Sequence, residues 1–255
     1  MALLKTLRDL VRCCNGLIDA KLAPTRTDLM GRYRDTISTC NRSIVLHIGS
    51  GRDKYNLEET VSNGEGISVA FDLDVNGLSL NKMSLRVRGD ASLLPFKADT
   101  FSLVFSEYTF EHLTRQWDVL SEIDRVLRSQ GSLVILVPNR NHYYTLVTRI
   151  TPFWFHRWWL KAQGVQEVDI DTFPTMHRWG AISDFQRSAA LYGWEIFDLQ
   201  STPGPTGYTK WLPIHPLFTV VDRVLSRWRT NHLAYMVHFV KTRSKNIERP
   251  DGLES

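Results

Sequence analysis

Two glycines and one carboxylate follow the first two apolar runs in the middle of the chain. Gly49 and Gly51 come directly after the run at 44–48, and Asp72 ends the run at 67–71. Glycine lets the backbone turn sharply and lets a ligand approach the main chain. A carboxylate at the end of a second strand can accept hydrogen bonds from both hydroxyls of a ribose. This pattern predicts a site for a nucleoside-containing cofactor.

The loop does not favour a dinucleotide. The fingerprint G-x-G-x-x-G would need a third glycine where Lys54 stands, and the helix that follows would have to hold a pyrophosphate. Asp53 instead places an acid beside the loop. An acid there suits a cofactor without phosphate, and S-adenosylmethionine carries a ribose, an adenine, a sulfonium and an amino-acid end but no phosphate.

The third apolar run also ends in residues that could hold this cofactor. Asp90 could accept a hydrogen bond from the adenine amino group, and the backbone N–H of Ala91 could donate to a ring nitrogen. Ser50 and Leu73, which adjoin the glycines and Asp72 in the chain, complete the cofactor site that we expect from the pattern.

Short apolar runs predict the strands that must position these residues. They alternate with amphipathic stretches, and one of these, with Trp117, Leu120 and Ile123 on one face, predicts a helix that ends at Gly131. Strands that alternate with helices indicate a parallel sheet covered on both faces. The five predicted strands lie at 43–48, 67–71, 85–88, 101–105 and 133–137.

The alternation stops after Pro138 for about 40 residues that are rich in aromatic side chains. A helix is expected to resume with Ser183 as its N-cap and to close at Gly193. Two further strands are expected at 194–199 and 232–240, with an amphipathic helix between them that contains Phe218 and Trp228. No internal repeat interrupts this order.

In its central part the chain resembles the class I S-adenosylmethionine-dependent methyltransferases, in particular the subgroup that acts on small molecules and lipids. The resemblance covers about residues 44–139, and no single motif is specific, but the motifs occur in family order. They are Val45–Gly51, Phe71-Asp72, Gly89-Asp90-Ala91, Leu94-Pro95-Phe96, Phe110–Leu113, Glu122–Leu127 and Gly131–Asn139.

The resemblance implies a seven-stranded Rossmann-like sheet with an antiparallel last strand. It implies that Gly49 and Gly51 abut the methionine part of the cofactor, and that Ser106 lines the pocket near the methyl group. It assigns the ribose to Asp72 and the adenine to Asp90 and Ala91.

Three positions depart from the family pattern. The family has an acid where His47 stands, a glycine where Asp53 stands and an aspartate where Ser102 stands. A histidine at position 47 would weaken the contact to the amino group of the cofactor, and it keeps open a scaffold protein that has the fold without the chemistry.

A hydroxyl acceptor must lose a proton when it is methylated, and histidine or a carboxylate usually takes it. His112 follows the fourth strand, with Glu111 beside it to orient it, and His142 follows the fifth strand. These three are the candidate catalytic residues. The alternatives are a helix start for Glu111 and His112 and loop packing for His142. No metal site is predicted.

The aromatic insertion at 140–180 occupies the place where resembling enzymes bind their acceptor. Tyr143, Tyr144, Trp154 and Trp158 are the candidate substrate residues. Their rings could cover an apolar acceptor pocket or lie at a lipid interface. Packing of the tryptophans onto the sheet is the alternative. A small-molecule or lipid-like acceptor is expected, and nucleic acid is disfavoured because no basic stripe accompanies the aromatic residues.

Charge and composition set the remaining expectations. The net charge is +4, with 43% hydrophobic and 23% charged residues, which excludes disordered and fibrous classes. Both ends are basic around a mildly acidic centre, and the N-terminal helix carries Lys5, Arg8 and Arg12 opposite an apolar stripe. It could cap the cofactor cleft, meet a membrane as a peripheral contact, or pack on the protein itself.

We therefore expect an α/β fold, doubly wound, with a mainly parallel seven-stranded Rossmann-like sheet, helices on both faces and an aromatic-rich insertion after the fifth strand. The expected organisation is a helical cap at 1–43, a methyltransferase domain at 44–243 with a lid at 140–180, and a polar tail at 244–255. The expected function is methyl transfer to oxygen by a cytoplasmic enzyme; an RNA methyltransferase is a further alternative.

The three cysteines are too few for a disulfide framework, and the oligomeric state stays open.

Overall fold

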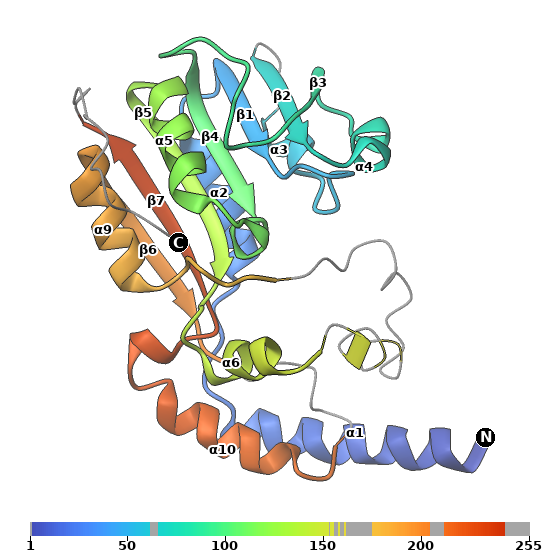
Figure 1. Ribbon diagram of the computed structural model, residues 1–255. Helices are drawn as coiled ribbons and strands as arrows, with labels where there is room; N and C mark the ends of the chain where they lie inside the picture. Colours follow the sequence, from blue (N-terminus) through green and yellow to red (C-terminus); the bar gives the residue numbers. More distant parts are fainter. Residues whose placement is uncertain are drawn as a thin grey trace.

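A seven-stranded sheet runs through the middle of the chain (Figure 1). The structure is a computed structural model and describes residues 2–61, 66–152, 154–155, 158, 161, 175–204 and 212–242. The strand order is β3-β2-β1-β4-β5-β7-β6. The strands are β1 (Ile44–Ile48), β2 (Ile67–Asp72), β3 (Leu85–Arg88), β4 (Phe101–Glu107), β5 (Leu127–Pro138), β6 (Trp194–Thr202) and β7 (Ala234–Lys241).

Strands β1 to β5 are parallel, and β7 runs antiparallel to both β5 and β6. The expected α/β fold, its mainly parallel sheet and its antiparallel last strand are therefore confirmed. The order reverses between β1 and β4, which are neighbours in the sheet although β2 and β3 lie between them in the chain. In open parallel sheets the ligand crevice lies at the carboxyl ends of the strands at this reversal.

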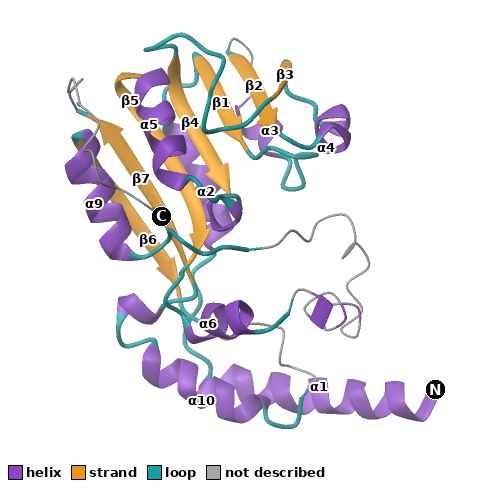
Figure 2. Cartoon of the chain, viewed as in Figure 1, coloured by secondary structure: helices purple, strands orange, loops and turns teal. Residues whose placement is uncertain are grey.

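Helices cover both faces of the sheet (Figure 2). The core on one face is built with buried residues of α2, α3 and α4, and the core on the other face with those of α5 and α9. These cores bury β1, β2, β4 and the second half of β5, which explains why the apolar runs of these strands are nearly continuous; β3 is largely exposed. The helices are α1 (Ala2–Leu22), α2 (Leu29–Thr39), α3 (Leu57–Val61), α4 (Val75–Leu80), α5 (Gln116–Val126), α6 (Tyr143–Ile150), α9 (Ile182–Tyr192) and α10 (His215–Leu225).

Three predicted boundaries were wrong. Helix α10 ends at Leu225, so Trp228 lies outside the helix that was expected to contain it. Helix α5 ends at Val126, and Gly131 lies inside β5, because the chain enters the strand directly at Leu127. Helix α9 begins at Ile182, and Ser183 is not its cap. The carboxylate of Asp184 accepts hydrogen bonds from the N–H groups of Gly180 and Ala181 instead, which satisfies donors at the helix start that would otherwise lack partners.

Three helices lie beyond the carboxyl ends of β4 and β5 (Figure 1). Helix α6 follows β5, and α10 and α1 lie side by side below it. The expected N-terminal helical segment is thus two separate helices, since α2 packs on the sheet while α1 pairs with α10. No helix among the described residues is long and apolar enough to span a membrane.

Candidate functional site

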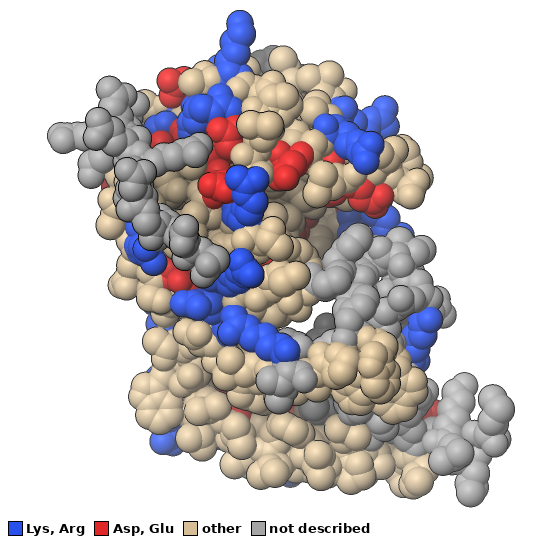
Figure 3. Space-filling view, viewed as in Figure 1, with Lys and Arg blue, Asp and Glu red and all other residues tan. Residues whose placement is uncertain are grey.

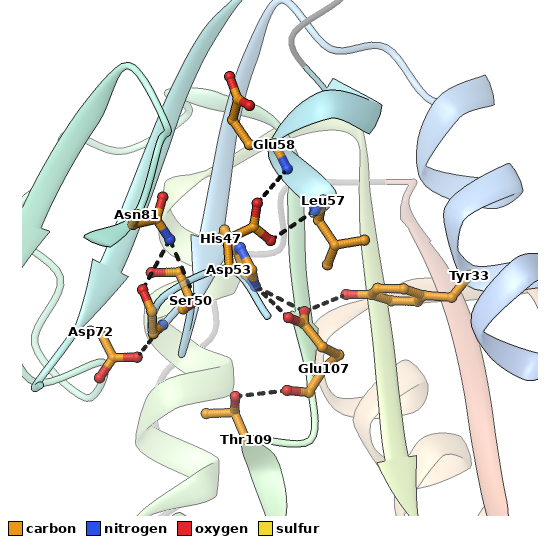
Figure 4. A network of polar contacts seen from close by, with 11 residues as sticks. Tyr33, His47, Ser50, Asp53, Leu57, Glu58, Asp72, Asn81, Glu107 and Thr109 are labelled. Atoms are coloured by element: carbon orange, nitrogen blue, oxygen red, sulfur yellow. Dashed lines mark hydrogen bonds and ion pairs between the residues drawn. The ribbon is translucent and has the colours of Figure 1, made fainter. Parts of the chain in front are cut away.

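The loop after β1 is held against the end of β2 by hydrogen bonds. Gly51 N–H donates to Asp72 Oδ2 at 2.8 Å (Figure 4). Asp74 N–H donates to Asp72 Oδ1, also at 2.8 Å. Gly49 and Gly51 have φ values of 71° and 44°, a backbone region that glycine enters without strain. A side chain at Gly51 would meet no atom within 4 Å, so this part of the loop has an open side that a ligand could contact.

Asp53 closes the other side of the loop. Its carboxylate accepts hydrogen bonds from Leu57 N–H at 2.7 Å and from Glu58 N–H at 2.9 Å. These are the first amides of α3, the helix whose N-terminus would hold the pyrophosphate of a dinucleotide. Because a carboxylate already neutralises this helix start, the loop suits a cofactor without phosphate. Asp53 is buried and does not face a ligand.

The remaining residues of the predicted cofactor site lie on the same edge of the sheet. The hydroxyls of Ser50 and Ser106 are buried, and neither has a hydrogen-bond partner among the described residues. Buried hydroxyls without partners are unusual, and both could bond to a ligand. Asp90 is exposed, and the N–H of Ser92 donates to its carboxylate. Hydrogen bonds from the backbone and the side chain of Ser92 lower the pKa of Asp90. The residues present therefore fit S-adenosylmethionine.

Leu73 and Ala91 flank these groups. Leu73 follows β2 and is exposed, whereas Ala91 follows Asp90 and is buried. Leu73 thus places an apolar side chain beside Asp72 in the chain, and Ala91 places a backbone amide shortly after β3.

A buried carboxylate lies where the first strand carries a histidine. His47 Nε2 is 2.8 Å from Glu107 Oε2, and the hydroxyl of Tyr33 donates to the same oxygen at 3.2 Å (Figure 4). His47 also stacks on the ring of Phe105. Glu107 ends β4, beside β1 at the point where strand order reverses. An acid is therefore present at this edge, although it comes from β4 and not from β1.

Sequence reasoning missed Glu107 and Tyr33. The only signal for Glu107 was its place directly after Ser106 at the end of the fourth apolar run. Tyr33 carried no signal, because it belongs to α2, 74 residues away from Glu107 in the chain. Burial and the adjacent Glu107 carboxylate raise the pKa of Tyr33 well above its ordinary value, with burial the larger cause, so its hydroxyl stays a hydrogen-bond donor.

Glu111 and His112 lie on a 3₁₀ turn (Phe110–His112) that follows β4. Glu111 is buried, and its Oε2 has no hydrogen-bond partner among the described residues. Burial raises the pKa of Glu111 to about 8. His112 is half-buried. The structure thus places a carboxyl group that is largely protonated at neutral pH next to the predicted base.

Replacing Glu111 by glutamine is expected to change how stability depends on pH. Between the ordinary value of 4.5 and about 8, the folded chain holds a proton on this group that the unfolded chain has lost. The free energy of unfolding therefore falls as pH rises through this window, by up to about 1.4 kcal/mol per pH unit. The variant should lose this part of the decline.

Urea midpoints at pH 5 and pH 8 measure the effect, with the exposed Glu59→Gln as the control. We expect the stability of Glu59→Gln to decline between the two pH values as much as that of the unmodified chain. The stability of Glu111→Gln should decline less. An equal decline in all three proteins would mean that Glu111 is ionised in the folded state.

His142 is buried and caps α6. Its Nδ1 accepts a hydrogen bond from Tyr144 N–H at 3.2 Å, and its Nε2 lies 3.8 Å from Asp222 Oδ1 on α10. Burial lowers the pKa of His142 to about 4. Because Nδ1 is used as an acceptor, the proton of the neutral ring is on Nε2. This geometry favours a capping role for His142 over the predicted role as a general base.

The candidate substrate residues fall into two groups. Tyr143 stacks on Phe218 of α10 and so joins α6 to α10. Burial raises the pKa of Tyr143. Tyr144 is half-buried. Trp154 and Trp158 are 69% and 55% exposed, so these two rings do not pack onto the sheet. Much of the predicted insertion, including 162–174, lies outside the described residues.

Comparisons with known proteins agree with this geometry. Residues 46–135 match a family model described as a methyltransferase domain. No curated protein matches the chain. Three solved structures share the fold: an S-adenosylmethionine-dependent methyltransferase from Archaeoglobus fulgidus, one from Mesorhizobium loti, and a chain of the complex that contains the Haloferax volcanii Trm112 methyltransferase activator.

The similarity to these structures is in fold and not in close sequence. The Archaeoglobus protein has 17% identity and a TM-score of 0.53, and the match covers 89% of this chain and 94% of that one. The Mesorhizobium protein has 12% identity and a TM-score of 0.52, and the match covers 82% of this chain and 96% of that one. The Haloferax chain has 14% identity and a TM-score of 0.57, and the match covers 94% of this chain and 97% of that one.

Proposed function

Because residues 46–135 match a family model described as a methyltransferase domain, we propose that the chain is a class I S-adenosylmethionine-dependent methyltransferase and that it methylates a small or lipid-like acceptor at oxygen. The observation that carries the proposal is the loop after β1, which is pinned to Asp72, open at Gly51 and closed to phosphate by Asp53. S-adenosylmethionine supplies the methyl group from a sulfonium centre.

The residues of the loop and the strand ends would hold the cofactor. Asp72 would accept hydrogen bonds from the ribose hydroxyls, since each carboxylate oxygen can accept a second bond besides the one from the backbone. Asp90 and Ala91 would bind the adenine. Ser106 would donate its unpartnered hydroxyl near the methyl group. Glu107 would receive the positively charged amino group, in place of the missing acid on β1.

His112 is the residue that we propose as the general base. It follows β4 on the same edge as the cofactor loop, and it is half-buried. Glu111 beside it is largely neutral, so it would orient the acceptor or the imidazole by donating a hydrogen bond rather than as a charge. The base would take the acceptor's proton while the acceptor is held in line with the methyl group.

Trp154→Ala and Trp158→Ala are expected to raise KM for the acceptor about fivefold or more, since a ring that contacts the acceptor contributes about 1 kcal/mol. Both rings are mostly exposed in the structure, so the melting temperature should not change. Phe197→Ala on β6 is the control, because Phe197 is 69% exposed like Trp154. A lower melting temperature with an unchanged KM would mean that the rings serve packing and not binding.

An assay with radiolabelled methyl donor tests the proposed activity. The full chain is incubated with labelled S-adenosylmethionine and fractions of a cell extract, and the mass of any labelled product is measured. The expected result is transfer of label to a small or lipid fraction. Absence of cofactor binding in calorimetry would favour the scaffold alternative. Label in RNA, together with a steep salt dependence in filter binding, would favour an RNA methyltransferase.

A further inference from the structure

Helices α1 and α10 form a pair whose polar residues face inward. The two helices run in parallel: Asn15 bonds to the carbonyl of Leu212, Asp19 to His215 and Thr219, and the carbonyl of Leu22 to Arg223. The bond between Asp19 Oδ1 and His215 Nε2 is 2.9 Å long. Polar side chains of both helices therefore take part in the contact between them.

The buried side of α10 is polar along its length. His215, Thr219 and Asp222 are buried, and they recur at steps of four and three residues, which places them on one side of the helix. His215 and Thr219 face α1, while Asp222 faces His142 of α6. The apolar side of α10 therefore points away from both neighbouring helices.

The exposed side of α10 is apolar. Leu217, Val220 and Val224 also recur at steps of three and four residues, and all three are largely exposed, Leu217 at 64%. In an ordinary surface helix the apolar stripe faces the core and the polar residues face water. Helix α10 has the reverse arrangement.

Helix α1 is reversed in the same way. Asn15 is buried, whereas Leu7, Leu10 and Leu17 are exposed and lie on the side opposite Asn15 and Asp19. Since Asp222 on the polar side of α10 faces His142 of α6, the apolar stripe of α10 lies on the side of the helix pair that points away from α6, which we call the outer side. Figure 3 shows a broad area with few charged side chains at the bottom of the molecule, where Figure 1 places α10 and α1.

The charges at the border of this outer side are mainly basic. Lys21, Arg223 and Arg227 are exposed at the ends of the two helices or just after α10. Among the described side chains of the two helices, Asp9 is the one carboxylate classed as exposed, since Asp19 and Asp222 are turned inward. An apolar stripe bordered by basic residues complements the surface of a lipid membrane, in which anionic headgroups cover an apolar layer of acyl chains.

We propose that the outer side of the α1–α10 pair docks on an anionic lipid membrane. Leu7, Leu10, Leu17, Leu217, Val220 and Val224 enter the boundary between headgroups and acyl chains, and the basic residues contact lipid phosphates. Exposed apolar stripes on two adjacent helices are otherwise costly in water. The helices lie in the plane of the membrane and do not cross it.

Vesicle flotation with the full chain tests the proposal. Vesicles of phosphatidylcholine alone are compared with vesicles that also contain phosphatidylglycerol. The chain is expected to float with the anionic vesicles and to bind them less well as salt is raised, because screening weakens the contact to phosphates. Binding to neutral vesicles should be at least tenfold weaker. Absence of binding to anionic vesicles would overturn the proposal.

Matched variants locate the contact. Leu217→Glu is expected to lower binding at least tenfold, and Leu17→Gln provides a second, milder test. Leu80→Glu is the control, because Leu80 on α4 is 65% exposed but lies on another part of the molecule. Arg227→Gln should lower binding about fivefold on anionic vesicles only. Equal binding by the Leu217 and Leu80 variants would overturn the proposal.

Light scattering after gel filtration, without lipid, tests whether a second copy of the chain covers the helix pair instead. We expect the unmodified chain and Leu217→Glu to have the same mass. A dimer that Leu217→Glu converts to a monomer would assign this surface to self-association and would overturn the membrane proposal.

Discussion

Replacing His112 by alanine is expected to slow turnover by about 10²–10⁴-fold, which is what a lost general base costs. The defect should lie in the chemical step, since His112 follows β4 and is not among the residues that hold the cofactor. Cofactor affinity should stay nearly unchanged. Single-turnover rates with the acceptor found in the extract assay, together with calorimetry of the cofactor, measure the two effects.

His142→Ala provides the contrast. This variant loses the cap of α6, where His142 Nδ1 accepts from Tyr144 N–H, and a lost cap costs about 0.5–2 kcal/mol of stability. We expect a lower melting temperature and a nearly normal chemical step. If His142→Ala slowed the chemical step and His112→Ala did not, the base would belong to the end of β5, as the sequence alone also allowed.

Replacing Asp72 by alanine is expected to lower cofactor affinity at least tenfold. The variant removes two charge-assisted hydrogen bonds to the ribose, each worth about 1.5–3 kcal/mol. It also frees the amides of Gly51 and Asp74, which Asp72 holds in place. Asp72→Asn is the milder variant, since it keeps the size of the side chain. Calorimetry with S-adenosylhomocysteine measures the change.

Unchanged affinity in both Asp72 variants would move the ribose elsewhere. Asp74 was the next candidate from the sequence, but its carboxylate caps α4 by accepting from Asn76 and Gly77. The structure therefore makes Asp74 a poorer ribose ligand than Asp72, whose chain position is at the strand end itself.

Glu107→Gln separates the two ends of the cofactor. If Glu107 receives the amino group, this variant should bind S-adenosylhomocysteine several-fold more weakly and bind methylthioadenosine, which lacks the amino-acid end, as before. Asp72→Ala should weaken both ligands, because both contain the ribose. Equal losses for both ligands in Glu107→Gln would indicate a general disturbance of the site.

The order of apolar runs was enough to predict most of the fold. The strand predicted at 85–88 agrees with β3, and those at 43–48 and 67–71 agree with β1 and β2 to within one residue. The runs that form β1 and β2 are short, apolar and mostly buried, so their pattern carries the signal directly. The start of β5 was missed because residues 127–131 mix polar residues with Gly131, which also suits a helix end.

The sequence by itself determined that Gly49, Gly51 and Asp72 lie together. They follow strands whose apolar character is local, and the carboxyl ends of parallel strands must meet at one edge. For Asp53 the sequence predicted only an acid beside the loop, and the structure shows that its carboxylate accepts hydrogen bonds from the first amides of α3.

Only the tertiary structure decided which groups meet across long separations. His47 and Glu107 are 60 residues apart, and Asp19 and His215 are 196 residues apart. Strand order brings the first pair together, because β1 and β4 are neighbours in the sheet. For α10, the amphipathic pattern predicts a helix but does not say which side faces the protein. Asp19 and His142 supply partners for the polar side, and this contact leaves the apolar side exposed.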